Sequence, residues 1–234
     1  AGQAAGLSDE DMKNLAAYFA AQQTRPGAAD VAVAPAGAVL TPERTLVLTY
    51  DNGAGLVFTR TISVDNDYMF TVTQKVKNTG TSAVTLYPYG LISRRTTPEV
   101  IGFYILHEGL LGVTNGTLSE IDYDDLQEEG QIKETTRGGW LGITDKYWLT
   151  ALVPDQKAKV TTRFLYRKES GDDLYQADYL SAPVTVAPGK TGEVQNRLFA
   201  GAKEVTVMDA YSEKLGIDRF DLTIDFGWFY FLTK

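Results

Sequence analysis

The sequence predicts an all-β protein with mainly antiparallel sheets and one short helix near each end of the chain. Three observations lead to this fold class. The chain contains 13 Tyr, 10 Phe and 3 Trp, which favour strands, and 22 Gly and 8 Pro, which suit many turns. Apolar and polar residues alternate in several segments that are separated by turn sequences. Strands and helices do not alternate along the chain, so a parallel nucleotide-binding sheet is not expected.

Composition excludes several classes of protein. A chain of 234 residues that is 44% hydrophobic and 22% charged is globular and can form one large β domain or two small ones. Its net charge of -8 repels nucleic acid, so no nucleic-acid partner is expected. The absence of cysteine rules out disulfides, thiolate metal sites and covalent haem attachment. No apolar run reaches the ~18 residues that span a bilayer, so the chain as given is expected to be soluble.

The N-terminal residues 7–23 predict an amphipathic helix. Ser8 is a suitable N-cap, and Met12, Leu15 and Phe19 lie on one apolar stripe. The helix is similar to the closing helix of class I cytochromes c, but no Cys-x-x-Cys-His sequence accompanies it.

The chain is expected to divide into three parts. Residues 1–24 form a helix outside the main domain. Residues 25–40, rich in Ala, Pro and Gly, form a linker. Residues 41–234 form the β domain and end in a membrane-proximal segment.

Strand candidates begin with a hairpin. Residues 45–50 and 56–64 flank a turn whose Asn-Gly step at 52–53 tolerates positive φ. Residues 68–77 predict a strand with one buried face. The residues expected to face the core are Tyr68, Phe70, Val72 and Val76, and those expected to face solvent are Thr71, Thr73, Lys75 and Lys77.

The rest of the chain continues this pattern, which suits a sandwich. Further strand candidates lie at residues 83–93, 147–153, 159–167, 182–187 and 193–200, the last two joined by a turn at 188–192. Residues 202–215 predict a second short helix.

The C-terminal segment combines a strand pattern with an aromatic run. Leu222, Ile224 and Phe226 alternate with Asp221, Thr223 and Asp225, which predicts a strand. Trp228, Phe229, Tyr230 and Phe231 follow, and such aromatic side chains favour the headgroup layer of a membrane. A last strand buried in the core is the alternative.

Few residues indicate catalysis. His107 is the only histidine, and no local motif supplies the Ser and acid of a triad or the further ligands of a zinc site. The acidic stretch at 120–129 lacks the calcium-loop pattern and is interpreted as a solvated loop. Neither a metal, a cofactor nor an enzymatic activity is therefore expected.

Two basic sequences could bind an anion or a sugar. They are Arg94 with Arg95, and the stretch from Arg137 to Trp140 that contains Gly-Gly-Trp. A β-bulge beside a packed indole explains the second one more readily.

Several motifs, in order, resemble the large periplasmic domain of the bacterial membrane protein insertase YidC. They are residues 41–62, Lys-Asn-Thr-Gly at 77–80, residues 133–140 with Gly-Gly-Trp, Ala-Pro-Gly-Lys-Thr-Gly at 187–192, Leu-Phe-Ala-Gly-Ala-Lys at 198–203 and Phe-Asp-Leu-Thr-Ile-Asp-Phe-Gly-Trp at 220–228. The resemblance covers roughly residues 38–234. It implies a β-supersandwich similar to galactose mutarotase-like folds, with a short C-terminal helix, between two transmembrane helices. The family domain normally begins with several further strands before the equivalent of Thr41, where this chain has its predicted helix.

The resemblance also implies a function and partners. The domain would be a noncatalytic contact module of an insertase and chaperone for inner-membrane proteins, on the periplasmic face of the bacterial inner membrane. Its partners would be SecDF and the Sec translocon, through residues 84–136, and the insertase's own membrane part, through residues 202–228. Nascent inner-membrane proteins would be met through the full-length insertase.

Candidate partner-contact residues are Arg94, Arg95, Tyr211, Asp225 and Phe226. A carbohydrate-binding or mutarotase-like sandwich is the alternative function. The lone His107 disfavours the enzymatic form of that alternative, because mutarotase chemistry uses His with Glu.

Overall fold

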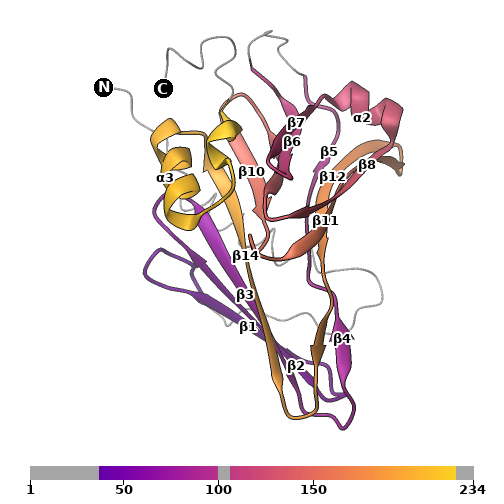
Figure 1. Ribbon diagram of the computed structural model, residues 1–234, viewed down its shortest axis with the longest axis vertical. Helices are drawn as coiled ribbons and strands as arrows, with labels where there is room; N and C mark the ends of the chain where they lie inside the picture. The colour runs from indigo at the N-terminus through magenta and orange to yellow at the C-terminus, as the bar shows by residue number, and fades with distance from the viewer. Residues whose placement is uncertain (1–36, 100–105, 225–234) are drawn as a thin grey trace.

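The computed structural model describes residues 37–99 and 106–224, which form three antiparallel sheets and three short helices (Figure 1). The eight-stranded sheet runs β1 (Leu46–Asp51), β2 (Leu56–Val64), β3 (Met69–Asn78), β14 (Thr191–Ala202), β10 (Trp148–Val153), β9 (Trp140–Thr144), β6 (Gly109–Thr114), β7 (Thr117–Ile121). The four-stranded sheet runs β5 (Tyr89–Arg95), β12 (Asp172–Ser181), β11 (Lys159–Glu169), β8 (Gln131–Arg137). The third sheet pairs β13 (Val184–Val186) with β4 (Val84–Leu86). The helices are α2 (Tyr123–Glu129), α3 (Val205–Leu215) and the 3-10 helix η1 (Phe220–Thr223).

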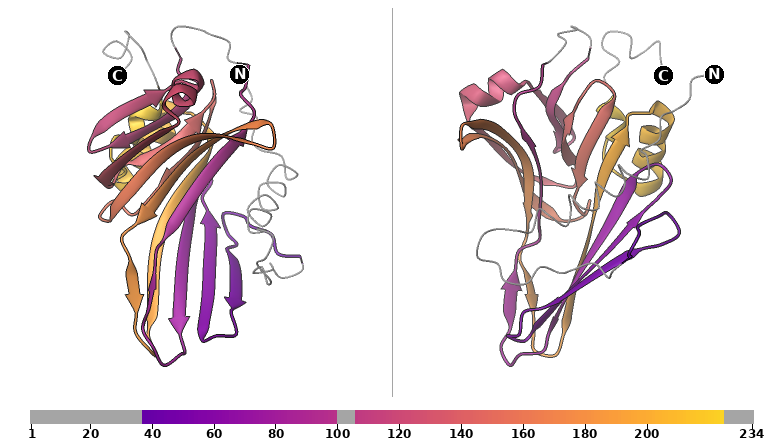
Figure 2. Two further views of the ribbon diagram at one scale, coloured as in Figure 1. Left: turned by 90° about the vertical axis from the view of Figure 1, so that its right-hand side faces the viewer. Right: turned by 180° about the vertical axis from the view of Figure 1, so that it is seen from behind.

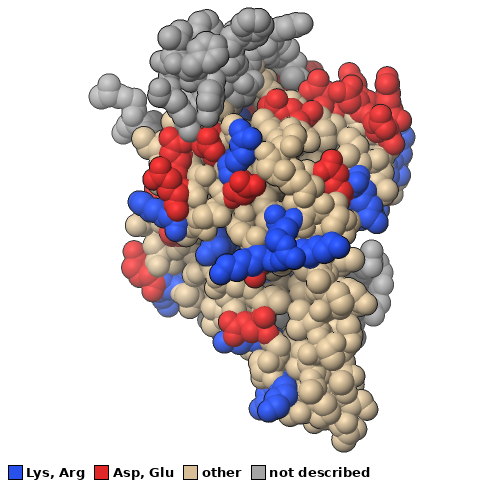
Figure 3. Space-filling model, viewed as in Figure 1, with Lys and Arg blue, Asp and Glu red and all other residues tan. Residues whose placement is uncertain are grey.

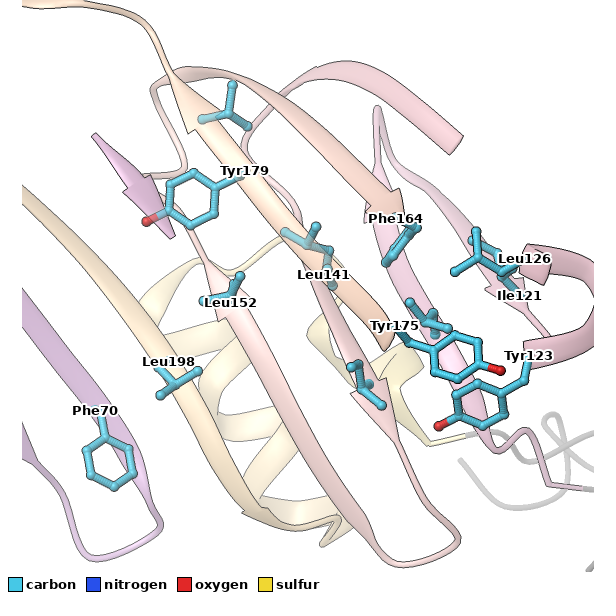
Figure 4. Packing of buried hydrophobic residues seen from close by; sticks show 14 of the residues in the cluster. Phe70, Ile121, Tyr123, Leu126, Leu141, Leu152, Phe164, Tyr175, Tyr179 and Leu198 are labelled. Atoms are coloured by element: carbon cyan, nitrogen blue, oxygen red, sulfur yellow. The ribbon is translucent and has the colours of Figure 1, made fainter. Parts of the chain in front are cut away.

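The two larger sheets pack face to face as a sandwich, and α3 covers the other side of the eight-stranded sheet (Figures 1 and 2). The core between the sheets takes residues from both of them, including Phe70, Leu198, Phe164 and Tyr179 (Figure 4). The predicted antiparallel all-β class and the short C-terminal helix are confirmed. The predicted helix at 7–23 and most of the predicted linker lie outside the described residues.

The first hairpin forms as its sequence predicts. Asn52 accepts hydrogen bonds at its side-chain oxygen from the backbone N–H groups of Ala54 (2.9 Å) and Leu56 (3.0 Å). Gly53 and Gly55 both have positive φ, which glycine adopts without strain. The predicted strands at 147–153, 159–167, 182–187 and 193–200 correspond to β10, β11, β13 and β14, and the predicted helix at 202–215 contains α3.

The predicted facing of β3 is confirmed in outline, with one addition. Phe70 is buried and Val72 packs against the core between the sheets, while Lys75 and Lys77 are exposed. Met69 is also buried, although it points to the opposite face of the sheet. The reason is α3, which covers that face, so a strand can bury residues on both sides here.

Three predictions about secondary structure were wrong. Residues 83–93 form two strands in different sheets, because Pro88 has no N–H to continue a ladder. The described part of the predicted terminal strand is instead η1, whose Phe220 inserts into the core under α3. The acidic stretch at 120–129 contains the helix α2, with Leu126 fully buried on its inner side. Strands β6, β7, β8, β9 and β12 were not predicted.

The Gly-Gly-Trp sequence packs as the sequence indicates. Trp140 is 1% exposed, and its Nε1 donates a hydrogen bond to the carbonyl oxygen of Asp218 at 3.1 Å. Gly139 has φ +82, and a Cβ there would overlap the carbonyl oxygen of Val113. Within residues 37–99 and 106–224, no helix is long and apolar enough to cross a membrane.

Candidate functional site

Arg94 joins the two larger sheets at one end of the sandwich. It lies on the inner face of β5, opposite Tyr175 of β12. Its Nη1 and Nη2 donate to the two carboxylate oxygens of Asp145, at 2.5 and 2.7 Å, from the turn between β9 and β10. Its Nη1 also donates to the hydroxyl of Tyr123 at 2.7 Å. The hydrogen bonds to Asp145 raise the pKa of the Arg94 guanidinium, so its charge is held against partial burial.

An aromatic cluster continues inward from this ion pair. The rings of Tyr123 and Tyr175 meet edge to face at 4.7 Å between centroids (Figure 4). The ring of Tyr166 lies 5.3 Å from that of Tyr175, again between centroids. The Tyr175 hydroxyl has hydrogen-bond partners in Gln127 (2.5 Å) and Thr97 (2.6 Å). Burial raises the pKa of Tyr123, so it stays a neutral donor and acceptor. Arg94, Asp145 and Tyr123 therefore link the two larger sheets through hydrogen bonds, and these three residues are called the clamp below.

The other predicted contact residues lie apart from this clamp. Arg95 points to the outer face, where it is exposed and pairs with Glu169 at 3.2 Å and Asp172 at 3.7 Å. Tyr211 lies on α3, is 7% exposed, and donates its hydroxyl hydrogen to Asp65, with both carboxylate oxygens at 2.8 Å. The structure therefore does not bring Arg94, Arg95 and Tyr211 together. Asp225 and Phe226 lie outside the described residues, as do Trp228, Phe229, Tyr230 and Phe231.

His107 is held by neighbouring groups. Its Nε2 lies 2.9 Å from the carbonyl oxygen of Leu110, and its Nδ1 lies 3.3 Å from a carboxylate oxygen of Asp122. A Cβ on Gly109 would meet the imidazole at 2.8 Å, so the ring packs directly on the backbone. Among residues 37–99 and 106–224, no group of three His, Cys, Asp or Glu side chains is placed to hold a metal ion.

A small recess lies between strands β6 and β7 of the eight-stranded sheet and strands β8 and β11 of the four-stranded sheet. Its lining residues are Gly112, Thr114, Ser119, Ile121, Ile132, Glu134, Thr162 and Phe164. Thr114 donates a hydrogen bond to Glu134 across it, so the one acidic group in the recess is engaged.

Two surfaces expose large apolar side chains. The β5 surface consists of Tyr87, Tyr89, Leu91 and Leu180, and Leu180 of β12 pairs with Tyr89. The hairpin tip consists of Tyr147 and Trp148, at the turn between β9 and β10, which are 63% and 43% exposed. Sequence reasoning missed both surfaces. The adjacent aromatic pair after Lys146 was the available signal for the tip, but a strand pattern alone does not tell which face is covered.

The fold defines the chain as a two-sheet antiparallel β-sandwich domain with exposed apolar surfaces at an edge and at a hairpin. The model of the YidC periplasmic domain family matches residues 13–234, so the chain belongs to that family. The match begins before residue 41, where the main domain is predicted to start.

Relatives agree with this assignment. The chain is 52% identical over 208 residues to the membrane protein insertase YidC of Methylobacterium sp. (strain 4-46), covering 85% of this chain and 33% of the relative. It is 51% identical over 200 residues to the protein of the same name from Beijerinckia indica subsp. indica, covering 84% of this chain and 33% of the relative. The chain thus spans about a third of the length of these relatives.

Solved structures with a similar shape are distant. The X-ray structure of a galactose mutarotase related enzyme from Lactobacillus acidophilus aligns with a TM-score of 0.48 and 10% identity, over 68% of this chain and 70% of that chain. A putative aldose 1-epimerase from Klebsiella pneumoniae aligns with a TM-score of 0.40 and 10% identity, over 74% of this chain and 54% of that one. Similarity at this level carries no conclusion about activity.

Proposed function

We propose that this chain is the noncatalytic periplasmic domain of a membrane protein insertase, and that it contacts partners at the periplasmic face of the bacterial inner membrane. The observation that carries the proposal is the family match over residues 13–234, together with relatives named membrane protein insertase at about half identity. In this role the domain assists the insertion and folding of inner-membrane proteins, which reach it through the full-length insertase.

The engaged state of the polar groups supports a noncatalytic role. A general base or an anion-binding arginine needs a face open to substrate. Both terminal nitrogens of Arg94 donate hydrogen bonds to Asp145, and one of them also donates to Tyr123. His107 packs against Gly109, and both of its ring nitrogens lie near acceptors. The same engagement disfavours a sugar site at Arg94.

The β5 surface is the proposed contact for SecDF and the Sec translocon. Strand β5 lies at the edge of its sheet, within the region 84–136 that the family resemblance indicates. Tyr89, Leu91 and Arg95 alternate along it on the outer face. An edge strand also leaves backbone N–H and C=O groups that an extended partner segment can pair with.

The neighbourhood of the β5 surface suits an apolar contact. Asp178, next to this row on β12, is only 4% exposed and lies 2.9 Å from Nη2 of Arg163. The hydrogen bond that Arg163 donates to Asp178 raises the pKa of the Arg163 guanidinium, so the two charges remain paired. A partner that covers Leu91 would therefore meet no unpaired charge at this pair. Arg95 adds a charged residue at the rim, while Asp225 and Phe226 remain candidate contacts to the insertase's membrane part.

Site-specific photo-crosslinking tests the proposal in the full-length insertase that carries this domain. A benzoylphenylalanine in place of Leu91 should give adducts with SecDF. The matched control is the same probe in place of Val47, which is 45% exposed on the edge strand of the other sheet and should give none. Equal adducts at both positions, or none at Leu91 in cells that still insert substrates, would contradict the proposed contact.

A further inference from the structure

The hairpin tip is unusual because its two aromatic side chains project from the fold. Most aromatic residues of the described part are buried or half-buried. Tyr147, at 63%, is the most exposed large hydrophobic residue in that part of the chain. The Nζ of Lys146 lies 5.2 Å from the centre of the Tyr147 ring. Tyr and Trp combine an apolar ring with one polar edge, which suits a boundary between water and an apolar phase.

The tip is rigidly attached to the fold. Trp148 pairs with Ala202 of β14, and the carbonyl oxygen of Tyr147 accepts a hydrogen bond from the N–H of Lys203 at 2.9 Å. The N–H of Asp145 donates to the carbonyl oxygen of Trp148 at 2.8 Å, and the side chain of Asp145 is held by Arg94. A contact made by a preordered hairpin loses little conformational entropy.

The hairpin tip lies at the same end of the molecule as the C-terminal end of the described chain. Strand β14 ends beside Trp148 and leads directly into α3, where Val205 is also exposed. Figures 1 and 2 show this end of β14 at the same end of the molecule as the yellow end of the described chain, at Ile224. Residues 228–231, which the sequence predicts to be membrane-proximal, follow a few positions later.

The charges near the tip argue for ring contacts with lipid rather than attraction to anionic lipid. Lys146 and Lys203 flank the rings, but Glu108 accepts a hydrogen bond from the N–H of Lys146, and Glu204 adjoins Lys203. Acidic side chains gather over α2, to one side of this end (Figure 3). With a net charge of -8, the domain gains no general attraction to an anionic surface.

We propose that Tyr147 and Trp148 contact the lipid headgroup layer of the bilayer, and so fix the orientation of the domain with the hairpin tip toward the membrane surface. This inference rests on the proposed function, since it needs the domain to be tethered to a membrane. The two rings would bind the layer of zwitterionic lipid headgroups, which they enter from the water side.

Fluorescence quenching in the reconstituted insertase tests the contact. The chain has no cysteine, so Tyr147→Cys provides one labelling position in this domain. The variant is placed in a full-length insertase that is otherwise free of cysteine, labelled with NBD, and reconstituted into phosphatidylcholine vesicles that contain headgroup nitroxide lipid. We expect strong quenching and a blue-shifted emission. The matched control is Tyr87→Cys, because Tyr87 is 58% exposed but lies between β4 and β5. That label should not be quenched.

Two further variables separate the outcomes. Adding Trp148→Ser to the Tyr147→Cys variant should reduce the quenching, and high salt or added phosphatidylglycerol should not change it. Equal quenching at positions 87 and 147, or none at 147, would overturn the inference. So would quenching that requires phosphatidylglycerol and disappears in salt, since lysines would then make the contact. Because these vesicles contain no SecDF, loss of quenching with intact Leu91 crosslinks would remove this inference alone.

Discussion

The two faces of the eight-stranded sheet are buried by different means. On the inner face, the core is spread over residues of both large sheets and of α2. On the outer face, α3 and η1 supply a compact aromatic group in which Phe220 meets Trp140, Phe199 and Tyr211 edge to face, at centroid distances from 5.5 to 6.4 Å. One short C-terminal segment, α3 with η1, therefore buries the aromatic group on the outer face, whereas the inner face is buried by a whole second sheet.

Replacing Phe220 with Ala breaks the outer face and should have the largest effect. Phe220 is fully buried and touches three other aromatic rings. Removing a buried Phe costs about 3 to 5 kcal/mol, through lost transfer free energy and the cavity left behind. Urea unfolding followed by circular dichroism measures the loss of free energy of unfolding.

The inner face provides the control for this change. Phe58 lies on β2 and is only half-buried, so Phe58→Ala should cost clearly less than Phe220→Ala. Equal losses for the two variants would mean that η1 is not the element that seals the outer face.

The same comparison explains which parts of the fold were predictable from sequence. The hairpin of β1 and β2 and the strand β3 follow the two-residue period, because one face of each is more exposed than the other. In β6 and β9 every residue is buried, so no alternation marks them in the sequence. The sequence did not indicate η1 either, because the apolar pattern of residues 222–226 favoured a strand, whereas in the structure Phe220 packs against Trp140, Phe199 and Tyr211, which are distant in sequence.

The polar ties of the two faces provide a second test. Replacing Arg94 with Met removes the clamp between the sheets and leaves the hydroxyl of buried Tyr123 without this partner. Because the side chain of Asp145 is 39% exposed and can be rehydrated, we expect a loss of about 1 to 3 kcal/mol in the free energy of unfolding. Urea titration at neutral pH measures it.

The counterpart on the outer face is Tyr211→Phe, which deletes the hydrogen bonds to Asp65 and keeps the ring packing. Asp65 is exposed, so the expected loss is smaller, about 1 to 2 kcal/mol. A larger loss for Tyr211→Phe than for Arg94→Met would place the stronger polar tie on the α3 side.

The candidate site could be predicted only in part, for a related reason. Adjacent arginines were visible in the sequence, but neighbouring residues on a strand point to opposite faces. Arg94 consequently enters the clamp and Arg95 reaches solvent, and the sequence did not show which would do so because Asp145 lies about fifty positions further along. The hairpin tip and the β5 surface depend on what other elements leave uncovered, which is a property of the assembled fold.

The smallest expected effect concerns the pH dependence of the inner face. The hydroxyl of Tyr166 donates to Asp173 at 2.8 Å, and with Thr97 it lowers the pKa of that carboxyl below its usual range. A carboxyl with a lowered pKa in the folded state favours folding when it is ionised. Its contribution is therefore present above about pH 4, the value for an unfolded Asp, and is lost as the pH falls through the lowered folded pKa.

Tyr166→Phe should raise the titration midpoint of Asp173, measured by carboxyl carbon NMR. It should also lower stability at neutral pH by an amount that shrinks in acid. Thr97→Val, which removes the weaker of the two hydrogen bonds, should move the midpoint less. An unchanged midpoint in Tyr166→Phe would show that this hydrogen bond does not set the acid response.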